Sequence, residues 1–266
     1  MSRIAACFES LASRNRKALT TFITAGDPTL AATVPALHAL AAAGADVIEL
    51  GIPFSDPEAE GPAIQASSER GLANGTSLAM CLDMVREFRE SDQTTPIVLM
   101  GYLNSVLAMG EGTFAQAAGE AGVDGLIMVN LPPEEAVALR SALESKGIDL
   151  IFLVAPTTTP ERLKKIVSVA SGFVYYVSLK GITGADHLDV GAVESKVGEI
   201  KAATRIPVQV GFGIKDGRTA RAVSEHADGV VVGSALVNTM AEHTDPDARL
   251  AALREQVAEL RRAMDA

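Results

Sequence analysis

The sequence lacks the features that mark membrane and disulfide-bonded proteins. No apolar run approaches the length of a membrane-spanning helix, and charges interrupt the N-terminal segment before the apolar stretch of a signal peptide can form. The two cysteines, Cys7 and Cys81, have neither the even-numbered framework of a disulfide scaffold nor the CxxC spacing of a zinc site. We therefore expect a cytoplasmic protein in a reducing compartment.

A surplus of basic residues is also missing. The chain has 23 Lys and Arg against 33 Asp and Glu, which gives a formal net charge of -10 at pH 7. Nucleic acid and anionic membrane surfaces are bound through a basic face, so neither is expected as a partner. Any anionic ligand must be small and held locally. The four histidines do not have the spacing of metal ligands, and no metal is expected.

Apolar residues, in contrast, are plentiful, at 48% of 266 residues, which is enough for a large core. Eight short runs rich in Val, Ile and Leu alternate with segments of helical spacing. These runs do not alternate polar with apolar residues, which is typical of strands in a parallel sheet covered on both faces. The predicted strands are 21–24, 47–50, 97–100, 126–129, 150–154, 173–177, 208–210 and 230–232.

A short repeat stands before four of these strands and ends at Asp46, Asp124, Asp149 and Asp228. The first three copies read Ala-Gly-Ala-Asp, Ala-Gly-Val-Asp and Lys-Gly-Ile-Asp. Their glycine can take the left-handed conformation that ends a helix, and the turn then leads into the next strand. One strand–helix unit is therefore reused along the chain, and no linker rich in Pro, Gly or Ser divides it.

This organisation predicts an α/β fold, a single (β/α)8 TIM barrel domain over residues 1–266 with an extra N-terminal helix. A doubly wound open sheet uses the same unit. However, no GxGxxG follows the first strand, and glycine-rich turns follow the seventh and eighth strands, where barrels bind phosphate. The extra helix carries Ile4, Phe8 and Leu11 on one face, which can plug the barrel floor.

A barrel places its chemistry at the C-terminal ends of the strands, and one strand carries a charge there. Glu49 stands in Val-Ile-Glu-Leu-Gly, among residues that are all apolar or small. Burial would raise its pKa towards neutrality and make it usable as a proton donor. The alternatives are an inward glutamate held by a cation, or one that points between helices.

The loop after this strand adds three carboxylates, those of Asp56, Glu58 and Glu60. One of these carboxylates and Glu49 can act as the acid and the base of one reaction. Glu58 taken alone is better explained as a solvated loop charge, because acidic rim residues need no special reason in an acidic protein.

Glycine-rich turns predict a phosphate site. Gly211-Phe-Gly213 ends the seventh strand and Gly233-Ser234 ends the eighth, where small residues let backbone N–H groups and a helix N-terminus point at an anion. After the sixth strand, Gly181-Ile-Thr-Gly184 has the glycines of a mobile lid; the alternative is a loop without a ligand role. The apolar residues expected at the mouth, where a flat ring would bind, are Phe22, Met100, Ile127, Leu153, Tyr175 and Phe212.

Four motifs together resemble the tryptophan synthase alpha chain family, essentially end to end. They are Phe22-Ile-Thr-Ala-Gly-Asp-Pro28, Glu49-Leu-Gly-Ile-Pro-Phe-Ser-Asp-Pro57, Val177-Ser-Leu-Lys-Gly-Ile-Thr-Gly184, and Gly211-Phe-Gly-Ile214 with Gly233-Ser234. The resemblance implies a lyase of tryptophan biosynthesis. It would split indole-3-glycerol phosphate into indole and glyceraldehyde 3-phosphate by retro-aldol cleavage, using acid–base chemistry without a metal, a Schiff base or a cofactor of its own.

The resemblance also implies residue roles. Glu49 would protonate C3 of the indole ring, and Glu60 would stabilise charge on the ring nitrogen. The substrate-binding residues would be Phe22, Ile64, Tyr175, Thr183, Gly184, Phe212, Gly213, Gly233 and Ser234. The expected partner is a beta chain carrying pyridoxal phosphate, in an alpha2beta2 complex, with Asp56, Tyr102 and Asn104 at or near it.

Three residues depart from the family pattern: Glu58 replaces an apolar residue, and Glu60 and Asn130 each replace an aspartate. A carboxylate misplaced by about 1 Å can cost on the order of a hundredfold in rate. One rival hypothesis is therefore a barrel that has lost activity and mainly binds and activates its partner. Another is a phosphate-binding isomerase or Schiff-base aldolase, but Lys180, the only lysine near the C-terminal end of a strand, lies past the strand on the expected lid.

Overall fold

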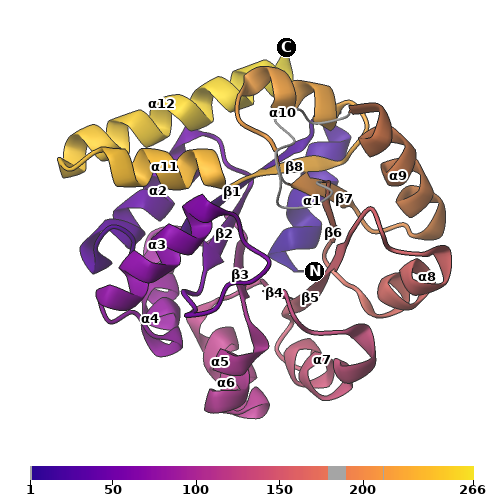
Figure 1. Cartoon of the computed structure of the whole chain (residues 1–266), viewed down its shortest axis with the longest axis horizontal. Coiled ribbons are helices and arrows are strands. Elements are labelled where there is room, and N and C mark those ends of the chain that lie inside the picture. Colours follow the sequence, from indigo (N-terminus) through magenta and orange to yellow (C-terminus); the bar gives the residue numbers. More distant parts are fainter. Residues whose placement is uncertain (1, 179–189, 212) are drawn as a thin grey trace.

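The computed structural model describes residues 2–178, 190–211 and 213–266, and its centre is a closed barrel of parallel strands (Figure 1). Within this part of the chain, the strands pair in the order β1 to β8, and β8 pairs with β1 to close the barrel. The strands are β1 Ala18–Thr24, β2 Val47–Gly51, β3 Ile97–Gly101, β4 Gly125–Met128, β5 Asp149–Val154, β6 Val174–Val177, β7 Val208–Gly211 and β8 Gly229–Val232. The predicted TIM barrel is confirmed, and the doubly wound alternative is wrong.

All eight predicted strands exist, with small differences at their ends. The largest difference is in β1, which begins at Ala18 rather than at the predicted residue 21. Ala18 and Leu19 pair with Gly229 and Val230 of β8. The early start of β1 is therefore set by closure of the barrel, a contact between the two ends of the chain that local sequence pattern does not reveal.

Helices surround the barrel as an outer ring, with α12 lying along α2, α10 and α11 (Figure 1). In the described residues the α-helices are α1 Arg3–Ser13, α2 Thr33–Ala43, α3 Pro62–Ala73, α4 Leu78–Arg89, α5 Leu103–Met109, α6 Glu111–Ala121, α7 Val137–Glu144, α8 Pro160–Val169, α9 Val190–Ala203, α10 Gly217–Ser224, α11 Ser234–Glu242 and α12 Pro246–Asp265. Two short 3-10 helices are η1 Leu30–Ala32 and η2 Pro133–Glu135. None of these helices is both long and apolar enough to cross a bilayer.

The predicted N-terminal helix is confirmed as α1, and it closes one end of the barrel. Ile4, Phe8 and Leu11 are buried and pack in the barrel interior, where the rings of Phe8 and Phe173 lie 6.0 Å apart. Ser2 begins the helix because its hydroxyl accepts a hydrogen bond from Ala5 N. The opposite end of the barrel, at the C-terminal ends of the strands, is thereby left for the site.

The repeated glycine before a strand acts as predicted. Gly44, Gly122 and Gly147 all have positive φ, at 107°, 87° and 70°, and Gly44 and Gly122 are the C-caps of α2 and α6. At Asp46 and Asp124 the aspartate of the repeat then ties its own strand to the start of the preceding strand in the barrel. Asp46 accepts the N–H of Leu19 and Asp124 that of Ile97, each at the start of a neighbouring strand.

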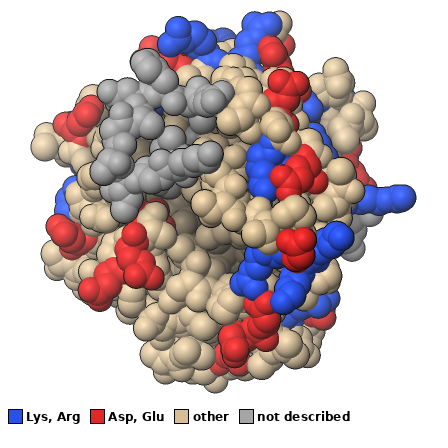
Figure 2. Space-filling model, turned by 45° about the vertical axis from the view of Figure 1, so that its right-hand side comes forward, with Lys and Arg blue, Asp and Glu red and all other residues tan. Residues whose placement is uncertain are grey.

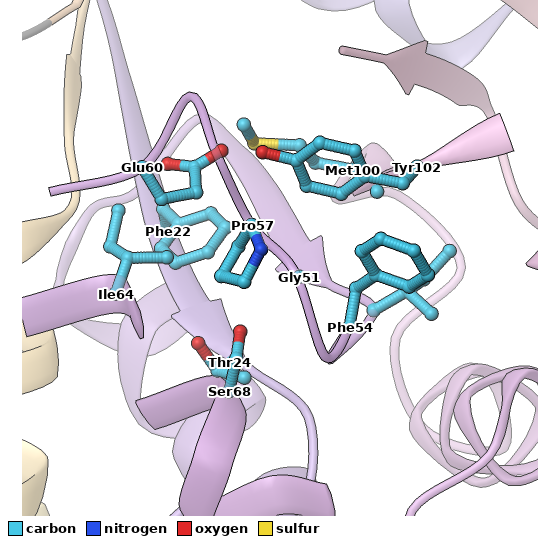
Figure 3. Close-up of a pocket in the computed structure, with 12 residues that line it drawn as sticks. Phe22, Thr24, Gly51, Phe54, Pro57, Glu60, Ile64, Ser68, Met100 and Tyr102 are labelled. Atoms are coloured by element: carbon cyan, nitrogen blue, oxygen red, sulfur yellow. The ribbon is translucent and has the colours of Figure 1, made fainter. Parts of the chain in front are cut away.

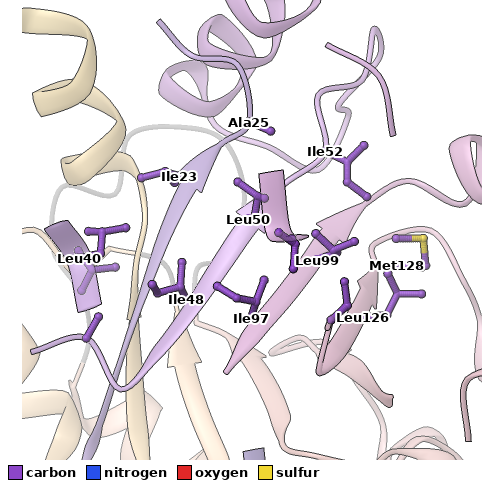
Figure 4. Packing of buried hydrophobic residues seen from close by; sticks show 14 of the residues in the cluster. Ile23, Ala25, Leu40, Ile48, Leu50, Ile52, Ile97, Leu99, Leu126 and Met128 are labelled. Carbon is purple, nitrogen blue, oxygen red and sulfur yellow. The ribbon is translucent and has the colours of Figure 1, made fainter. Parts of the chain in front are cut away.

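The core has two parts. Outward-facing strand residues such as Ile48, Leu50 and Leu99 pack under the helices (Figure 4), and inward-facing residues fill the barrel. The surface in Figure 2 has a hollow among uncharged residues, while acidic and basic side chains lie beside each other along one side.

Candidate active site

Glu49 lies inside the barrel, near its open end. Val47, two residues earlier on β2, belongs to the interior cluster, so Glu49 faces the same way. The strand registers place Glu49 in one layer of inward residues with Ile127, Tyr175 and Val231. The next layer towards the mouth contains Phe22, Met100, Leu153 and Gly211. Glu49 therefore lies directly beneath the barrel mouth, and not between helices.

The Glu49 carboxylate is buried and unpaired. The residue is 1% exposed, and among the described residues neither carboxylate oxygen has a hydrogen-bond partner. Burial, with a smaller contribution from the charge of Glu60, raises the pKa of Glu49 from 4.5 to about 8. The described ion pairs include none to Glu49, so the alternative of a glutamate held by a side-chain cation has no support there. At neutral pH the carboxyl is mostly protonated and ready to donate.

Glu60 is the second carboxylate of the site. It ends the loop after β2, directly before the first residues of α3, and a turn bond from its N–H to the carbonyl of Pro57 orients it. The residue is only 8% exposed, and burial raises the pKa of Glu60 from 4.5 to about 7. Its charge acts on Glu49 and Tyr175, so the structure brings together the two carboxylates that the sequence singled out.

An apolar pocket opens beside Glu60 at the barrel mouth (Figure 3). Phe22 and Met100 line it as predicted, whereas Ile127 and Tyr175 pack in the interior and Leu153 packs against that interior cluster. The lining residues are Phe22, Thr24, Gly51, Ile52, Phe54, Pro57, Glu60, Ile64, Ser68, Met100, Gly101 and Tyr102. The walls are mostly apolar, with the hydroxyls of Thr24, Ser68 and Tyr102 and one carboxylate, which suits a flat aromatic ring that carries a polar N–H.

Two glycines shape this region by lacking side chains. A Cβ on Gly51 would lie 2.6 Å from Cζ of Phe22, and one on Gly211 would lie 2.2 Å from the hydroxyl oxygen of Tyr175. Both distances are far below van der Waals contact. The two rings therefore take their places only because these positions are glycine.

The glycine-rich turns lie close to the pocket. Gly233 is the N-cap of α11 and Ser234 its first residue, and a Cβ on Gly233 would lie 3.4 Å from Cβ of Phe22. Gly213 has a φ of 79°, which favours glycine. The α11 N-terminus therefore faces the end of the barrel where the pocket opens. Lys180, Thr183, Gly184 and Phe212 lie outside the described residues.

The residues expected near a partner divide into two groups. Asp56 and Asn104 are exposed, as is Glu58, which agrees with a solvated loop charge for Glu58. Tyr102 is instead 4% exposed and lines the pocket. Asn130 has a structural role that sequence reasoning missed: its Oδ1 accepts the N–H of Leu103 at 2.8 Å, at the start of α5.

A closed (β/α)8 barrel with two buried carboxyls of raised pKa, Glu49 beneath the pocket at its mouth and Glu60 in the pocket wall, defines an acid–base barrel enzyme. The family model described as "Tryptophan synthase alpha chain" matches residues 8–265. The chain belongs to the tryptophan synthase alpha chain family. It is accordingly a lyase that cleaves indole-3-glycerol phosphate, and family membership implies a tryptophan synthase beta chain as its partner.

Individual relatives agree with this assignment. The chain is 57% identical to the tryptophan synthase alpha chain of Thioalkalivibrio sulfidiphilus, with 100% of both chains covered. It is 56% identical to that of Burkholderia thailandensis, covering 100% of this chain and 97% of the relative. Among solved structures, tryptophan synthase subunit alpha from Legionella pneumophila superposes with a TM-score of 0.92 at 44% identity, covering 100% and 99% of the two chains.

Proposed function

We propose that the chain performs the retro-aldol cleavage of indole-3-glycerol phosphate with Glu49 as proton donor to C3 of the indole ring. Glu60, as a carboxylate, stabilises the positive charge that develops on the ring nitrogen. The observation that carries this assignment is the pair itself: a buried, unpaired Glu49 beneath an apolar pocket that Glu60 lines. Acid–base chemistry suffices for the reaction.

Burial raises the pKa of both carboxyls, and Glu49, which lies deeper in the barrel, is the one assigned as the acid. Glu49, at 1% exposed, has its pKa raised to about 8, and Glu60, at 8% exposed, to about 7. The charge of an ionised Glu60 also raises the pKa of Glu49, so ionisation of Glu60 favours a protonated Glu49, which is the state that the reaction needs. Two carboxylates of the same residue type thus acquire opposite roles from their surroundings.

Proton balance assigns Glu49 a second step. After Glu49 protonates C3, the bond between C3 and the hydroxyl-bearing side-chain carbon breaks, and its electron pair returns to the ring. That carbon becomes the aldehyde of glyceraldehyde 3-phosphate, and its hydroxyl proton must go to a base. Glu49 is then ionised and lies beneath the same pocket, so it recovers its proton and completes the cycle.

Substrate binding is assigned to the residues that the sequence motifs mark, of which Thr183, Gly184 and Phe212 lie outside the described part of the chain. The phosphate would be held by backbone N–H groups of the two glycine-rich turns and the N-terminus of α11. The proposed phosphate ligands are Gly184, Gly213, Gly233 and Ser234, with Thr183 ordering the lid. The proposed ring contacts are Phe22, Ile64, Tyr175 and Phe212.

We propose further that the chain, as one barrel domain over residues 1–266, is the alpha subunit of a cytoplasmic alpha2beta2 complex. Asp56 and Asn104 are exposed at the mouth end of β2 and β3, where a partner that receives indole would dock. No cofactor is proposed on this chain, and pyridoxal phosphate belongs to the beta chain. Sedimentation of the chain mixed with a matching beta chain tests this: a species of the mass of alpha2beta2 supports it, and unmixed chains contradict it.

The reaction is tested by product analysis across pH. The purified chain should release indole and glyceraldehyde 3-phosphate in equal amounts. The dependence of kcat/KM on pH should be bell-shaped, with an acid limb near 7 from Glu60 and an alkaline limb near 8 from Glu49. Borohydride added with substrate should trap no imine. A trapped imine, or products other than these two, would reject the proposal.

A further inference from the structure

We propose that Tyr102 is a positioning residue for the lyase reaction, which fixes Glu60 by holding the backbone just before it. This inference rests on the function proposed above for Glu60. The Tyr102 hydroxyl oxygen accepts a hydrogen bond from Ala59 N at 3.1 Å. Ala59 directly precedes Glu60, so this hydrogen bond ties the backbone next to Glu60 to the barrel and thereby helps to place the Glu60 carboxylate.

Tyr102 is itself firmly placed. It directly follows β3 and is the N-cap of α5, and its ring is 4% exposed. The ring stacks on that of Phe54, with centroids 5.0 Å apart and planes at 17°. Phe54 lies at the start of the loop after β2 and Ala59 near its end, so the Tyr102 side chain contacts both ends of the loop.

The loop has few other bonds to the rest of the barrel. Two of its backbone bonds are internal turns, from Glu58 N to the carbonyl of Asp56 and from Glu60 N to that of Pro57. The Gln65 amide donates to the Glu60 carbonyl at 2.7 Å, but Gln65 lies on the helix that the loop leads into. Among the described residues outside the loop and α3, Tyr102 is the one whose side chain makes a hydrogen bond to the loop.

The hydroxyl acts through Glu60 and not as a proton donor to the substrate. Burial, opposed by the Ala59 hydrogen bond and assisted by the charges of Glu60 and Glu58, raises the pKa of Tyr102 to about 12. The phenol therefore keeps its proton at all pH values where the enzyme works. Its hydroxyl points towards the Glu60 carboxylate (Figure 3), which it helps to keep over the pocket and out of water.

Loss of the hydrogen bond between Tyr102 and Ala59 should change the pH dependence of the rate, which a merely structural role of Tyr102 would not do. The pKa of Glu60 is raised to about 7 because the carboxyl is buried. The other titratable groups that act on this pocket are Glu49 on β2, Tyr175 on β6 and Glu58 in the loop. If the loop is released, Glu60 moves into water and its pKa falls towards the ordinary value, so the acid limb of the rate profile moves to lower pH.

The test compares Tyr102→Phe with Tyr176→Phe. Each variant loses one phenolic hydroxyl, but Tyr176 is buried on β6, outside the pocket, and serves as the matched control. Steady-state indole release is measured across pH, and hydrogen–deuterium exchange is followed in the peptide that contains the loop. Thermal unfolding of both variants confirms that they are folded.

Tyr102→Phe is expected to lower kcat about tenfold with KM changed by less than about threefold, and to move the acid limb down by about one pH unit. The loop amides should exchange faster than in the parent and in Tyr176→Phe. A parental rate profile in Tyr102→Phe, or a lower rate with unchanged loop exchange, would overturn the inference. Failure of the parent to release indole would instead reject the proposed function, and the exchange comparison would still decide whether Tyr102 holds the loop.

Discussion

Replacing Glu49 with glutamine should make the protein more stable, and increasingly so as pH rises. Charging the buried carboxyl costs the folded state free energy, because the pKa of Glu49 is raised to about 8 when folded and is near 4.5 when unfolded. The unfolded chain therefore ionises first, and stability falls as pH rises from 4.5 to 8. With about 1.36 kcal/mol per pKa unit, this contribution lowers the free energy of unfolding by about 2–3 kcal/mol between pH 5 and 7.

Glutamine has nearly the same shape and does not ionise, so Glu49→Gln lacks this pH-dependent loss. Urea unfolding of parent and variant at pH 5, 6, 7 and 8 gives the difference in unfolding free energy, and any pH-independent effect of the new amide cancels in its slope. The difference should grow in favour of the variant as pH rises. Parallel stability curves would mean that Glu49 has an ordinary pKa and is not a neutral-pH acid.

Three further tests by substitution probe the surroundings of the site. Thr20→Val should lower the free energy of unfolding in urea by about 1–3 kcal/mol, because it removes the 2.7 Å hydrogen bond to the buried Oε1 of Gln209. Adding Gln209→Leu should restore most of this free energy, and no recovery would contradict the pairing of the two side chains. Gly51→Ala should lower kcat/KM by about tenfold or more while the circular dichroism stays parental, because the new Cβ displaces the ring of Phe22. Asn130→Ala should lower the unfolding free energy by about 1 kcal/mol, whereas Asn130→Asp, which keeps the acceptor for the first N–H of α5, should leave it nearly unchanged.

The barrel was predictable from sequence because its pattern is local and repeated. Unbroken apolar runs mark strands covered on both faces, and the glycine of the repeat marks helix ends, as the positive φ of Gly44 and Gly122 confirms. Glu49 was found for the same reason: a charge inside such a run is conspicuous. Both signals need only a few neighbouring residues to be read.

The features that were not predicted depend on contacts between distant residues. Thr20 and Gln209 are 189 positions apart, and nothing near either residue shows that they share a hydrogen bond inside the barrel. Tyr102 was expected near a partner, but its burial and its bond to Ala59 depend on how the β2 loop folds over β3. Closure of the barrel brings Thr20 to Gln209, and pairing of β2 with β3 brings Ala59 to Tyr102.

The most direct test of the account is the rate of indole release from indole-3-glycerol phosphate by Glu49→Gln relative to the parent at pH 7.5, with and without a matching beta chain. The parent should be active, the beta chain should raise its rate, and the variant should lose on the order of 10²–10⁴-fold in both mixtures. A variant rate within a few-fold of the parent would contradict the assignment of Glu49 as the proton donor. An inactive parent that still activates the beta chain would favour a barrel that only binds its partner.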